Sequence, residues 1–585
     1  MAHLDGGAHR RHPRRGLPGP AGRRAGRGPR PAPRVAGAAA AGRLRRHRAG
    51  VVRGAQEPQP DPCVLHLPQH GRRRGDPGHG RRDAARLSTR GVVATAYSRI
   101  GAAVRRALPL LVALVISIAG SCFAVAQPQV WGADEAAHLF RAYQVSTGGW
   151  VPQRLEERGP IPRYGGQVPA SFVRLADSGT ARQWSKPQRG PVMGNPDARR
   201  PLLDAPVGTE TTEAKFVNTA AYAPTSYAPA VVGLWTSRLA GLDVGGTILV
   251  ARLLGVLTAA VAGALAVRLL RGTGWEYLAA VVACLPSVIF QAATVSADTM
   301  TNAVTLVLAA SFVRLTLTDS PPSRAATWAL ALSVLLVGVA KPTYAPMALL
   351  LLVVPASRLA WRRSATGRGP SRAVGAGVVG TSLAVSVGWL SLAAGTTAGM
   401  GVVWDPRDPT AVRPDDQRAF VLGHLPEMVR IAYRTLADST PKYLRELFVQ
   451  TGYQVEGSGG AMILVLMALA LAWFLAPRPV VSRARLATVA LVVAASGALI
   501  FGALYLSFTP VGLWAVAGVQ GRYFYPLLLP ALLCLRALLP ARLVGDGATG
   551  ADDGRVAARW VVGLVVGACA LAVLKYVLLT WATVS

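Results

Sequence analysis

The chain has 585 residues, 51% of them apolar, and a formal net charge of +34. Uncharged runs of about 20 residues recur from residue 107 to the C-terminus, and a helix of about 20 apolar residues is long enough to cross a bilayer. This pattern excludes a chain made only of soluble domains and indicates an integral membrane protein with several helical spans.

The N-terminal segment, residues 1–95, has a different composition. Residues 1–90 contain 21 Arg, no Lys and five acidic residues, a net charge of +16, and are rich in Gly, Pro and Ala. Because this segment has no periodic apolar face, we expect a disordered tail. Two interpretations are open: an Arg-rich tail that binds nucleic acid or anionic lipid, or upstream DNA translated from a start codon set too early, with a start near Val92 or Val93. We favour the second and predict no nucleic-acid partner.

Residues 96–585 are expected to form one membrane domain in which hydrophobic runs alternate with polar segments. The first run, 107–126, precedes a polar region at 127–221, and a second polar region covers 397–459. Between them the run Tyr222–Leu239 is interrupted by prolines. The other runs lie at 249–270, 276–291, 297–316, 326–340, 344–361, 374–396, 460–476, 486–508, 524–541 and 559–581. The predicted fold is therefore all-α and polytopic.

The charges of the loops predict the orientation, because basic residues in short loops tend to stay cytoplasmic. All the later basic clusters are cytoplasmic only if Tyr222–Leu239 does not cross the membrane, so we interpret that segment as an interfacial or re-entrant helix. About 11 spans result, with 10–13 compatible with the runs, and both polar regions lie on the outer face. The clusters fall in alternate loops, at 268–271, 314–324, 358–372, 478–485 and 536–559.

The second polar region contains one helical pattern. Apolar residues recur there at helical spacing after Asp415 and Asp416, which can cap a helix N-terminus. The pattern predicts an amphipathic helix that lies on the outer leaflet or covers a cavity, with a simple packing helix as the alternative. The apolar residues are Val421, Leu425, Met428, Val429 and Leu436.

The segment Trp131–Tyr143 carries the first candidate site. If a helix starts at Asp134, then Asp134, His138 and Arg141 lie on one face, and Glu135 projects about 100° away. A carboxylate at a membrane surface can deprotonate an acceptor hydroxyl or bind a divalent cation. Asp134, Glu135 and His138 are therefore candidate catalytic residues, and Arg141 is a candidate phosphate ligand. The alternative is a helix-capping Asp134 with a solvated ion pair to Arg141.

Further polar residues are expected at the same outer level, at the ends of hydrophobic runs. Charges in such places are costly and usually face a cavity or a partner. Lys341 and Arg522 are suited to hold an anionic phosphate, and the alternative for each is a side chain that extends to the lipid headgroups. The remaining candidates for substrate binding are Asp298, Arg445, Gln520 and Tyr523.

Motifs for other chemistries are missing from the sequence. Only His138 and His424 lie outside the N-terminal tail, and the five cysteines lack metal-ligand spacing, so we expect no histidine-based metal site. There is no Walker A loop, which disfavours ATP-driven transport by this chain alone. A carboxylate-bound Mg²⁺ or Mn²⁺ is the candidate cofactor.

Six segments, in their order and spacing, resemble the domain of unknown function 2142 family of bacterial predicted membrane proteins: Asp134–Gln144, 222–229, Ser296–Asp298, Ala340–Tyr344, Tyr443–Phe448 and Gln520–Phe524. The resemblance covers residues from about Ala107 to Thr580. That family in turn resembles the GT-C superfamily of membrane glycosyltransferases, which carry an acidic motif in the first outer loop and use polyprenyl-phosphate-linked sugars. The resemblance implies that Asp134 or Glu135 is the catalytic base or a metal contact.

The leading hypothesis is a multi-pass glycosyltransferase of the bacterial plasma membrane that acts in cell-envelope glycan assembly. It would transfer a sugar from a polyprenyl-phosphate donor on the outer face of the bilayer. The alternative is a non-catalytic membrane protein, either a lipid or polysaccharide carrier or an assembly partner.

Overall fold

The computed structural model describes residues 107–155, 163–183, 196–316, 321–361, 371–399, 412–452, 457–479, 481–539 and 553–581. All of them belong to one unit of the chain, Pro77–Ser585. The tail predicted at 1–95 lies outside the described residues, and so do short parts of both predicted outer loops.

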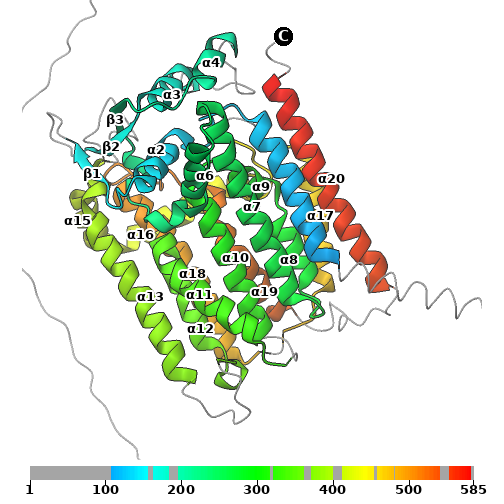
Figure 1. Ribbon diagram of the computed structural model, residues 1–585. Coiled ribbons are helices and arrows are strands. Elements are labelled where there is room, and N and C mark those ends of the chain that lie inside the picture. Colours follow the sequence, from blue (N-terminus) through cyan, green and yellow to red (C-terminus); the bar gives the residue numbers. More distant parts are fainter. Residues whose placement is uncertain are drawn as a thin grey trace, which may run out of the picture. The chain divides into compact units, whose positions relative to one another are not determined.

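Helices dominate the described residues, which confirms the predicted all-α polytopic class (Figure 1). Six of them are long and apolar enough to cross a membrane, and large apolar side chains such as Leu110, Leu257 and Leu491 are exposed on their surfaces. Exposed leucines on such helices are expected where acyl chains replace water. The six are Ala107–Ala126, α7 (Val244–Leu270), α10 (Ala297–Thr316), α13 (Ser371–Ala393), α18 (Arg483–Ser507) and α20 (Asp553–Trp581).

The other predicted runs form shorter or interrupted helices, so the count of 11 spans stays a prediction. Prolines explain several of the breaks, because proline removes a backbone donor and crowds the preceding turn. Pro286 separates two short helices, and Pro342 and Pro346 lie in a 3₁₀ segment. These elements are α8 (Glu276–Ala283), α9 (Pro286–Ala292), α11 (Arg324–Ala340), η2 (Pro342–Leu349), α12 (Leu350–Val353), α17 (Gly459–Leu475) and α19 (Tyr525–Leu538).

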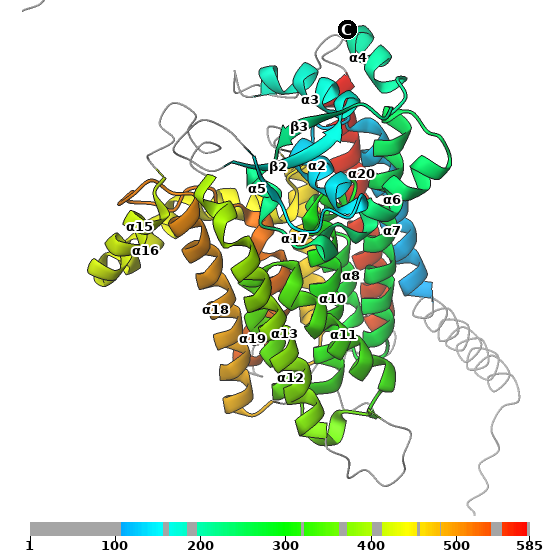
Figure 2. The same cartoon turned by 60° about the vertical axis from the view of Figure 1, so that its left-hand side comes forward.

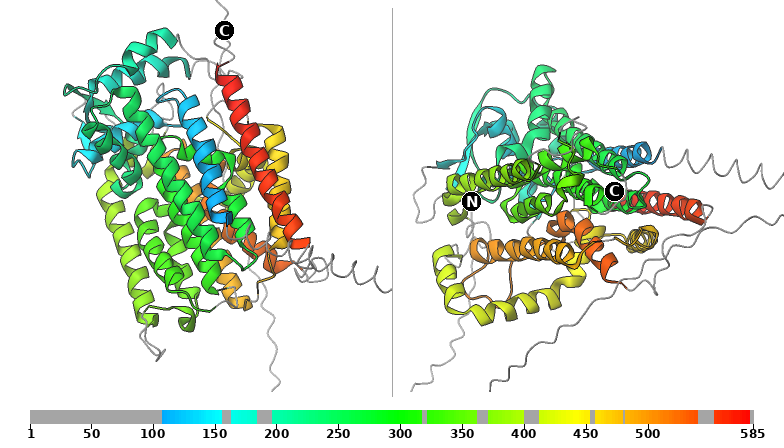
Figure 3. Two further views of the ribbon diagram at one scale, coloured as in Figure 1. Left: turned by 45° about the vertical axis from the view of Figure 1, so that its right-hand side comes forward. Right: turned by 90° about the horizontal axis from the view of Figure 1, so that it is seen from below.

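The spans pack around one large apolar cluster of buried side chains. The helix Ala107–Ala126 lies between α7 and α20 (Figures 1 and 3). The rings of Phe123 and Tyr576 meet edge to face with centroids 5.7 Å apart, and on the other side a side chain at Gly120 would collide with Val256. Small residues therefore allow the close helix approach that is common in membranes.

The Pro-containing run after the first polar region is a short helix, as expected. It consists of η1 (Pro224–Tyr227) and α6 (Ala228–Leu239). Twelve α-helical residues extend about 18 Å, which is less than the hydrocarbon thickness of a bilayer. The helix α6 packs on α7.

The first polar region is a folded cap with its own apolar core, and it contains a sheet that the all-α prediction did not include. Three antiparallel strands in the order β1-β2-β3 lie beside short helices (Figures 1 and 2). Leu139, Phe172 and Phe216 are fully or almost fully buried in this cap. Its elements are α2 (Glu135–Ser146), β1 (Gln153–Leu155), β2 (Arg163–Pro169), α3 (Ala170–Gln183), α4 (Pro196–Leu203), β3 (Thr211–Lys215) and α5 (Val217–Ala220).

The second polar region contains the predicted helical pattern as two helices, α15 (Pro414–Gly423) and α16 (Leu425–Phe448). They project sideways from one end of α18 (Figure 2). The short helix η5 (Gly521–Phe524) packs against α16 and leads directly into α19. Short 3₁₀ turns at η3 (Ala356–Arg358) and η4 (Ala394–Gly399) flank α13 in the chain.

Candidate functional site

A cavity of about 590 Å³ lies where residues of the cap meet residues of α9, α16 and α18. Segments that are far apart in the sequence contribute to its wall. Both polar and apolar side chains line it. The polar ones include Asp134, Asn218, Lys442, Glu446, Gln520 and Arg522, and the apolar ones include Phe290, Leu504, Phe508 and Val519.

Asp134 lines this cavity from an unusual backbone conformation. The helix α2 begins one residue after it, and Asp134 is the N-cap in the left-handed region, at φ 57° and ψ 17°, without a capping hydrogen bond from its side chain. Its carboxylate instead accepts a hydrogen bond from Asn218 at 2.9 Å. The structure therefore does not support the alternative of a helix-capping aspartate, because the carboxylate makes no hydrogen bond to the first turn of the helix.

Arg522 connects two carboxylates at the cavity wall. Its Nη2 atom lies 3.8 Å from Oδ2 of Asp134, and its Nε atom lies 3.5 Å from Oδ2 of Asp298. Lys341 pairs with the other oxygen of Asp298. The structure thus brings four of the predicted residues into one chain of alternating charges, Asp134–Arg522–Asp298–Lys341, in which two negative charges balance two positive ones.

Two tyrosine rings enclose the ammonium group of Lys341. Its Nζ atom lies 4.9 Å from the ring centroid of Tyr222 and 5.0 Å from that of Tyr523. Burial raises the pKa of Tyr523 to about 12 and also raises the pKa of Tyr222. Both phenols therefore remain neutral at physiological pH and hold the lysine through cation–π contacts.

His138 is buried behind the cavity wall and does not carry a charge. Its Nδ1 atom is 2.8 Å from the hydroxyl of Tyr227, and its ring stacks on Tyr222 with centroids 5.8 Å apart. Burial lowers the pKa of His138 from 6.5 to about 3, more strongly than the nearby Asp298 raises it. A neutral imidazole in this place orients the two tyrosines.

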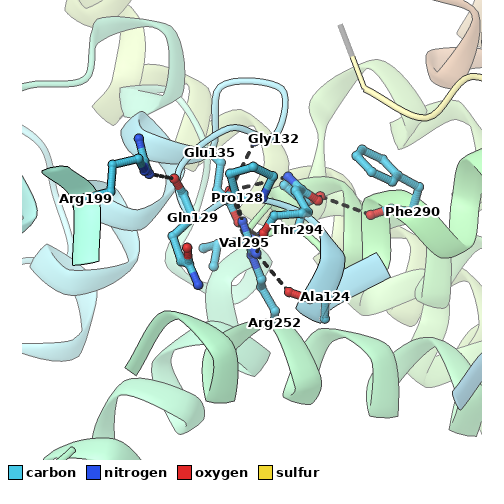
Figure 4. Close-up of polar contacts among 11 residues, drawn as sticks. Ala124, Pro128, Gln129, Gly132, Glu135, Arg199, Arg252, Phe290, Thr294 and Val295 are labelled. Atoms are coloured by element: carbon cyan, nitrogen blue, oxygen red, sulfur yellow. Dashed lines mark hydrogen bonds and ion pairs between the residues drawn. The ribbon is translucent and has the colours of Figure 1, made fainter. Parts of the chain in front are cut away.

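Glu135 lies in a separate buried cluster (Figure 4). Both of its oxygens accept from Arg252, at 2.7 and 2.6 Å, and neither side chain is exposed. Arg252 also donates to three carbonyl groups at and just after the end of the first span, those of Ala124, Gln127 and Pro128. The carboxylate further accepts from the backbone N–H groups of Gly132 and Val295. Glu135 is not among the residues that line the cavity.

Arg141 likewise binds the protein itself. Its guanidinium donates to the side chain of Gln144 and to the carbonyls of Gly149 and Trp150, at 2.5–3.0 Å. A longer contact of 3.5 Å reaches the carbonyl of Tyr222. The side chain is fully buried, so Arg141 is arranged to hold the turn after α2 and the loop before η1.

Two other candidate residues differ in their position. Gln520 lines the cavity, whereas Arg445 is exposed on α16 and is not among the lining residues. Its neighbour Glu446 does line the cavity and accepts a hydrogen bond from the backbone N–H of Gly521 at 2.6 Å. The motif around Arg445 therefore reaches the site through Glu446.

Sequence reasoning missed Asn218 and Lys442 at the cavity and Arg252 behind it. Arg252 had a usable signal, because a charge within a hydrophobic run is normally paired or functional. Asn218 had none, since it occupies an irregular polar segment whose pairing with Asp134 depends on the folded cap.

The carboxylates do not form a ready-made metal site. Among the described residues, no group of three or more His, Cys, Asp or Glu side chains is placed to hold a metal ion. The guanidinium of Arg522 lies between Asp134 and Asp298, so a divalent cation would have to displace it to bind both. The donor set does not fit a resident Mg²⁺ or Mn²⁺, and we derive no step through one.

Comparison with known proteins gives one match. The model of a family described as "Predicted membrane protein (DUF2142)" matches residues 117–531. The matched range includes the four residues whose charges alternate at the site, Asp134, Arg522, Asp298 and Lys341. No curated protein and no solved structure matches the chain.

Proposed function

The chain belongs to the family of predicted membrane proteins DUF2142, and from its cavity we propose that it is a membrane glycosyltransferase. In this proposal it acts in the bacterial plasma membrane, uses a polyprenyl-phosphate-linked sugar on the outer face and contributes to cell-envelope glycans. One observation carries the proposal: the carboxylate of Asp134 and the guanidinium of Arg522 face one cavity at the end of apolar helices.

The proposed reaction is a displacement at the anomeric carbon of the donor sugar. Asp134 accepts the proton of an acceptor hydroxyl, the oxygen of that hydroxyl bonds to the anomeric carbon, and the bond from this carbon to the phosphate oxygen breaks. The leaving lipid phosphate carries away the electron pair. Arg522 offers the fork of donors that suits phosphate oxygens.

Neighbouring residues have supporting roles in this scheme. Lys341 and Asp298 hold Arg522 in place and set the balance of charge beside the phosphate. Asn218 orients the carboxylate of Asp134. Phe290, Leu504 and Phe508 in the lining of the cavity offer apolar contacts for the first part of the lipid chain. His138 orients tyrosines, and Glu135 and Arg141 stabilise the loops that carry the site.

A second candidate function rests on the mutual pairing of the charges. Asp134, Arg522, Asp298 and Lys341 neutralise one another, which is also what a purely structural network would do. A non-catalytic lipid or polysaccharide carrier, or an assembly partner, would keep this arrangement without performing chemistry.

The substitution Asp134→Asn distinguishes the two functions. Asparagine tolerates the left-handed backbone and has nearly the same shape, so the fold should persist while the base is lost. We expect the glycan made by the protein to disappear from the cell envelope, because loss of a general base costs about 10²–10⁴-fold in rate. The measurement is a comparison of envelope glycans from wild-type, deletion and variant strains at matched expression.

The matched control is Asp204→Asn. Asp204 forms an exposed ion pair with Arg200 on the cap, and its loss should leave the glycans unchanged. A deletion phenotype that Asp134→Asn fully restores would refute catalysis by Asp134 and favour the carrier.

A further inference from the structure

The helix α16 presents three faces along its length. With about 100° between successive residues, Leu425, Val429, Tyr433 and Leu436 fall in one stripe, and these side chains are 61%, 73%, 70% and 44% exposed. Ile431 and Thr435 lie on the face that is buried against the protein. A polar stripe follows on the third face, with Arg430, Arg434 and Asp438 exposed.

Such a division is typical of a helix in the plane of a membrane surface. A packing helix needs one apolar face, but α16 has a buried apolar face against the protein and a second, exposed one beside its charges. Amphipathic helices of this kind insert their apolar side about 5–10 Å into the boundary between headgroups and acyl chains.

The position of α16 identifies what covers the exposed stripe. The helices α15 and α16 project sideways from the end of α18 (Figure 2), and Gln417 of α15 donates to the carbonyl of Tyr505 in α18 at 3.0 Å. The surface of α18 exposes Leu491, Leu499 and Leu506, which acyl chains must cover if this helix spans the bilayer. Ile431 of α16 and Tyr505 of α18 belong to one apolar cluster, so α16 lies close to the end of α18 and the same bilayer can cover the exposed side chains of both.

We propose that α15 and α16 form an interfacial pair of helices that docks on the lipid surface of the leaflet nearest the cavity. Leu425, Val429, Tyr433 and Leu436 insert below the headgroups, and Arg430 and Arg434 stay at the level of the phosphates. This inference concerns the bilayer and holds whether or not the protein transfers sugars.

The docked α16 would also set the position of the cavity wall. Thr435 accepts a hydrogen bond from the backbone N–H of Val516 at 3.0 Å, and Glu446 accepts from that of Gly521 at 2.6 Å. The contact at Gly521 is so close that an added Cβ would lie 1.9 Å from the carbonyl oxygen of Tyr443. The backbone just before Arg522 is therefore held by α16. The depth of α16 in the membrane then fixes the position of Arg522 relative to the membrane surface.

Spin labels on single cysteines test this docking. The full chain carries Cys63→Ser and Cys122→Ala, because Cys122 is exposed and Cys63 lies outside the described residues. Into this background we introduce Val429→Cys or Tyr433→Cys. The matched controls on the polar stripe are Arg430→Cys and Arg434→Cys. Each labelled protein is reconstituted into vesicles of phosphatidylethanolamine and phosphatidylglycerol, and collision rates with oxygen and with a water-soluble nickel chelate are measured.

We expect the two stripes to give opposite results. Labels at Val429 and Tyr433 should collide mainly with oxygen, at a depth of about 5–10 Å below the phosphates, and labels at Arg430 and Arg434 mainly with the nickel chelate. Equal access of the chelate to all four positions would overturn the proposal. Spin–spin broadening at Val429 that disappears on dilution with unlabelled protein would also overturn it, because a second copy of the chain would then cover the stripe.

Discussion

Asp134 adopts a backbone conformation that is costly for a residue with a side chain. Positions in the left-handed region cost about 1–3 kcal/mol and persist only where the surroundings hold them; Val130, four residues earlier, shares this feature at φ 60°. The buried Glu135–Arg252 pair and the hydrogen bond from Asn218 provide such surroundings. In this conformation the carboxylate of Asp134 makes no capping hydrogen bond to α2, and the residue lines the cavity.

At the residue scale, the sequence allowed prediction of the charged members of the site but not of their partners. Lys341 and Arg522 were recognisable because a charge at the end of an apolar run is costly and usually faces a cavity or a partner. Helical spacing placed Asp134, His138 and Arg141 on one face, but α2 begins at Glu135 and the three side chains have different partners. Spacing describes a regular helix, whereas a left-handed residue at its start redirects the side chain.

The buried His138 makes the stability of the protein depend on pH. Its pKa is about 3 in the folded protein and 6.5 in the unfolded chain, so below pH 6.5 the unfolded chain binds the additional proton and the free energy of unfolding falls. This loss is on the order of 1 kcal/mol at pH 5.5 and grows until about pH 3.

The substitution His138→Phe isolates this effect. Phenylalanine keeps the stacking on Tyr222 and cannot bind a proton. We expect the wild-type thermal midpoint in detergent to fall more than that of the variant between pH 7.5 and pH 5.5. An equal fall in both proteins would show that His138 does not stay neutral when folded.

At the element scale, long uniform patterns were predictable and short irregular elements were not. The six long apolar helices and the amphipathic α16 follow from hydrophobic runs and helical period. The sheet β1-β2-β3 does not, because the seven residues of β2 are Arg-Tyr-Gly-Gly-Gln-Val-Pro, and this composition is typical of a turn. Its strands are stabilised by pairing and by the apolar core of the cap.

Arg252 joins several elements, and its loss should destabilise all of them. In Arg252→Met the buried carboxylate of Glu135 loses its positive partner, and three carbonyls lose the hydrogen bonds that Arg252 donates. We expect a decrease of about 3–5 kcal/mol in stability, as for other broken buried ion pairs. The measurement is the thermal midpoint of the purified protein in detergent.

Arg268→Met is the matched control on the same helix. Arg268 lies exposed near the end of α7, and its replacement should change the midpoint little. The double variant Arg252→Met/Glu135→Gln should lose less than the sum of its single variants, because the charge left unpaired is then removed as well. Equal midpoints for Arg252→Met and Arg268→Met would contradict the role of this cluster in joining the elements.

At the scale of the whole membrane domain, the predicted orientation places the cavity on the outer face. Loop charges support it, and they do so independently of any catalytic residue. The structure adds that the cap, α16 and η5 meet at one end of the long helices around the cavity, while Arg268 and Arg271 lie at the opposite end of α7 from the cap. An experiment that determines on which side of the membrane the cap lies therefore also locates the cavity, α16 and η5.

Impermeant maleimide labelling of intact cells supplies this test, with single cysteines in the background Cys63→Ser/Cys122→Ala. Glu210→Cys lies on the cap and Arg271→Cys in the loop after α7, and both positions are exposed. We expect Glu210→Cys to react in intact cells and Arg271→Cys only after permeabilisation. The reason is that the positive-inside rule assigns the loop after α7 to the cytoplasm. The reverse pattern would place the cavity, Asp134 and the docked α16 on the cytoplasmic side, where a donor presented on the outer face cannot reach them.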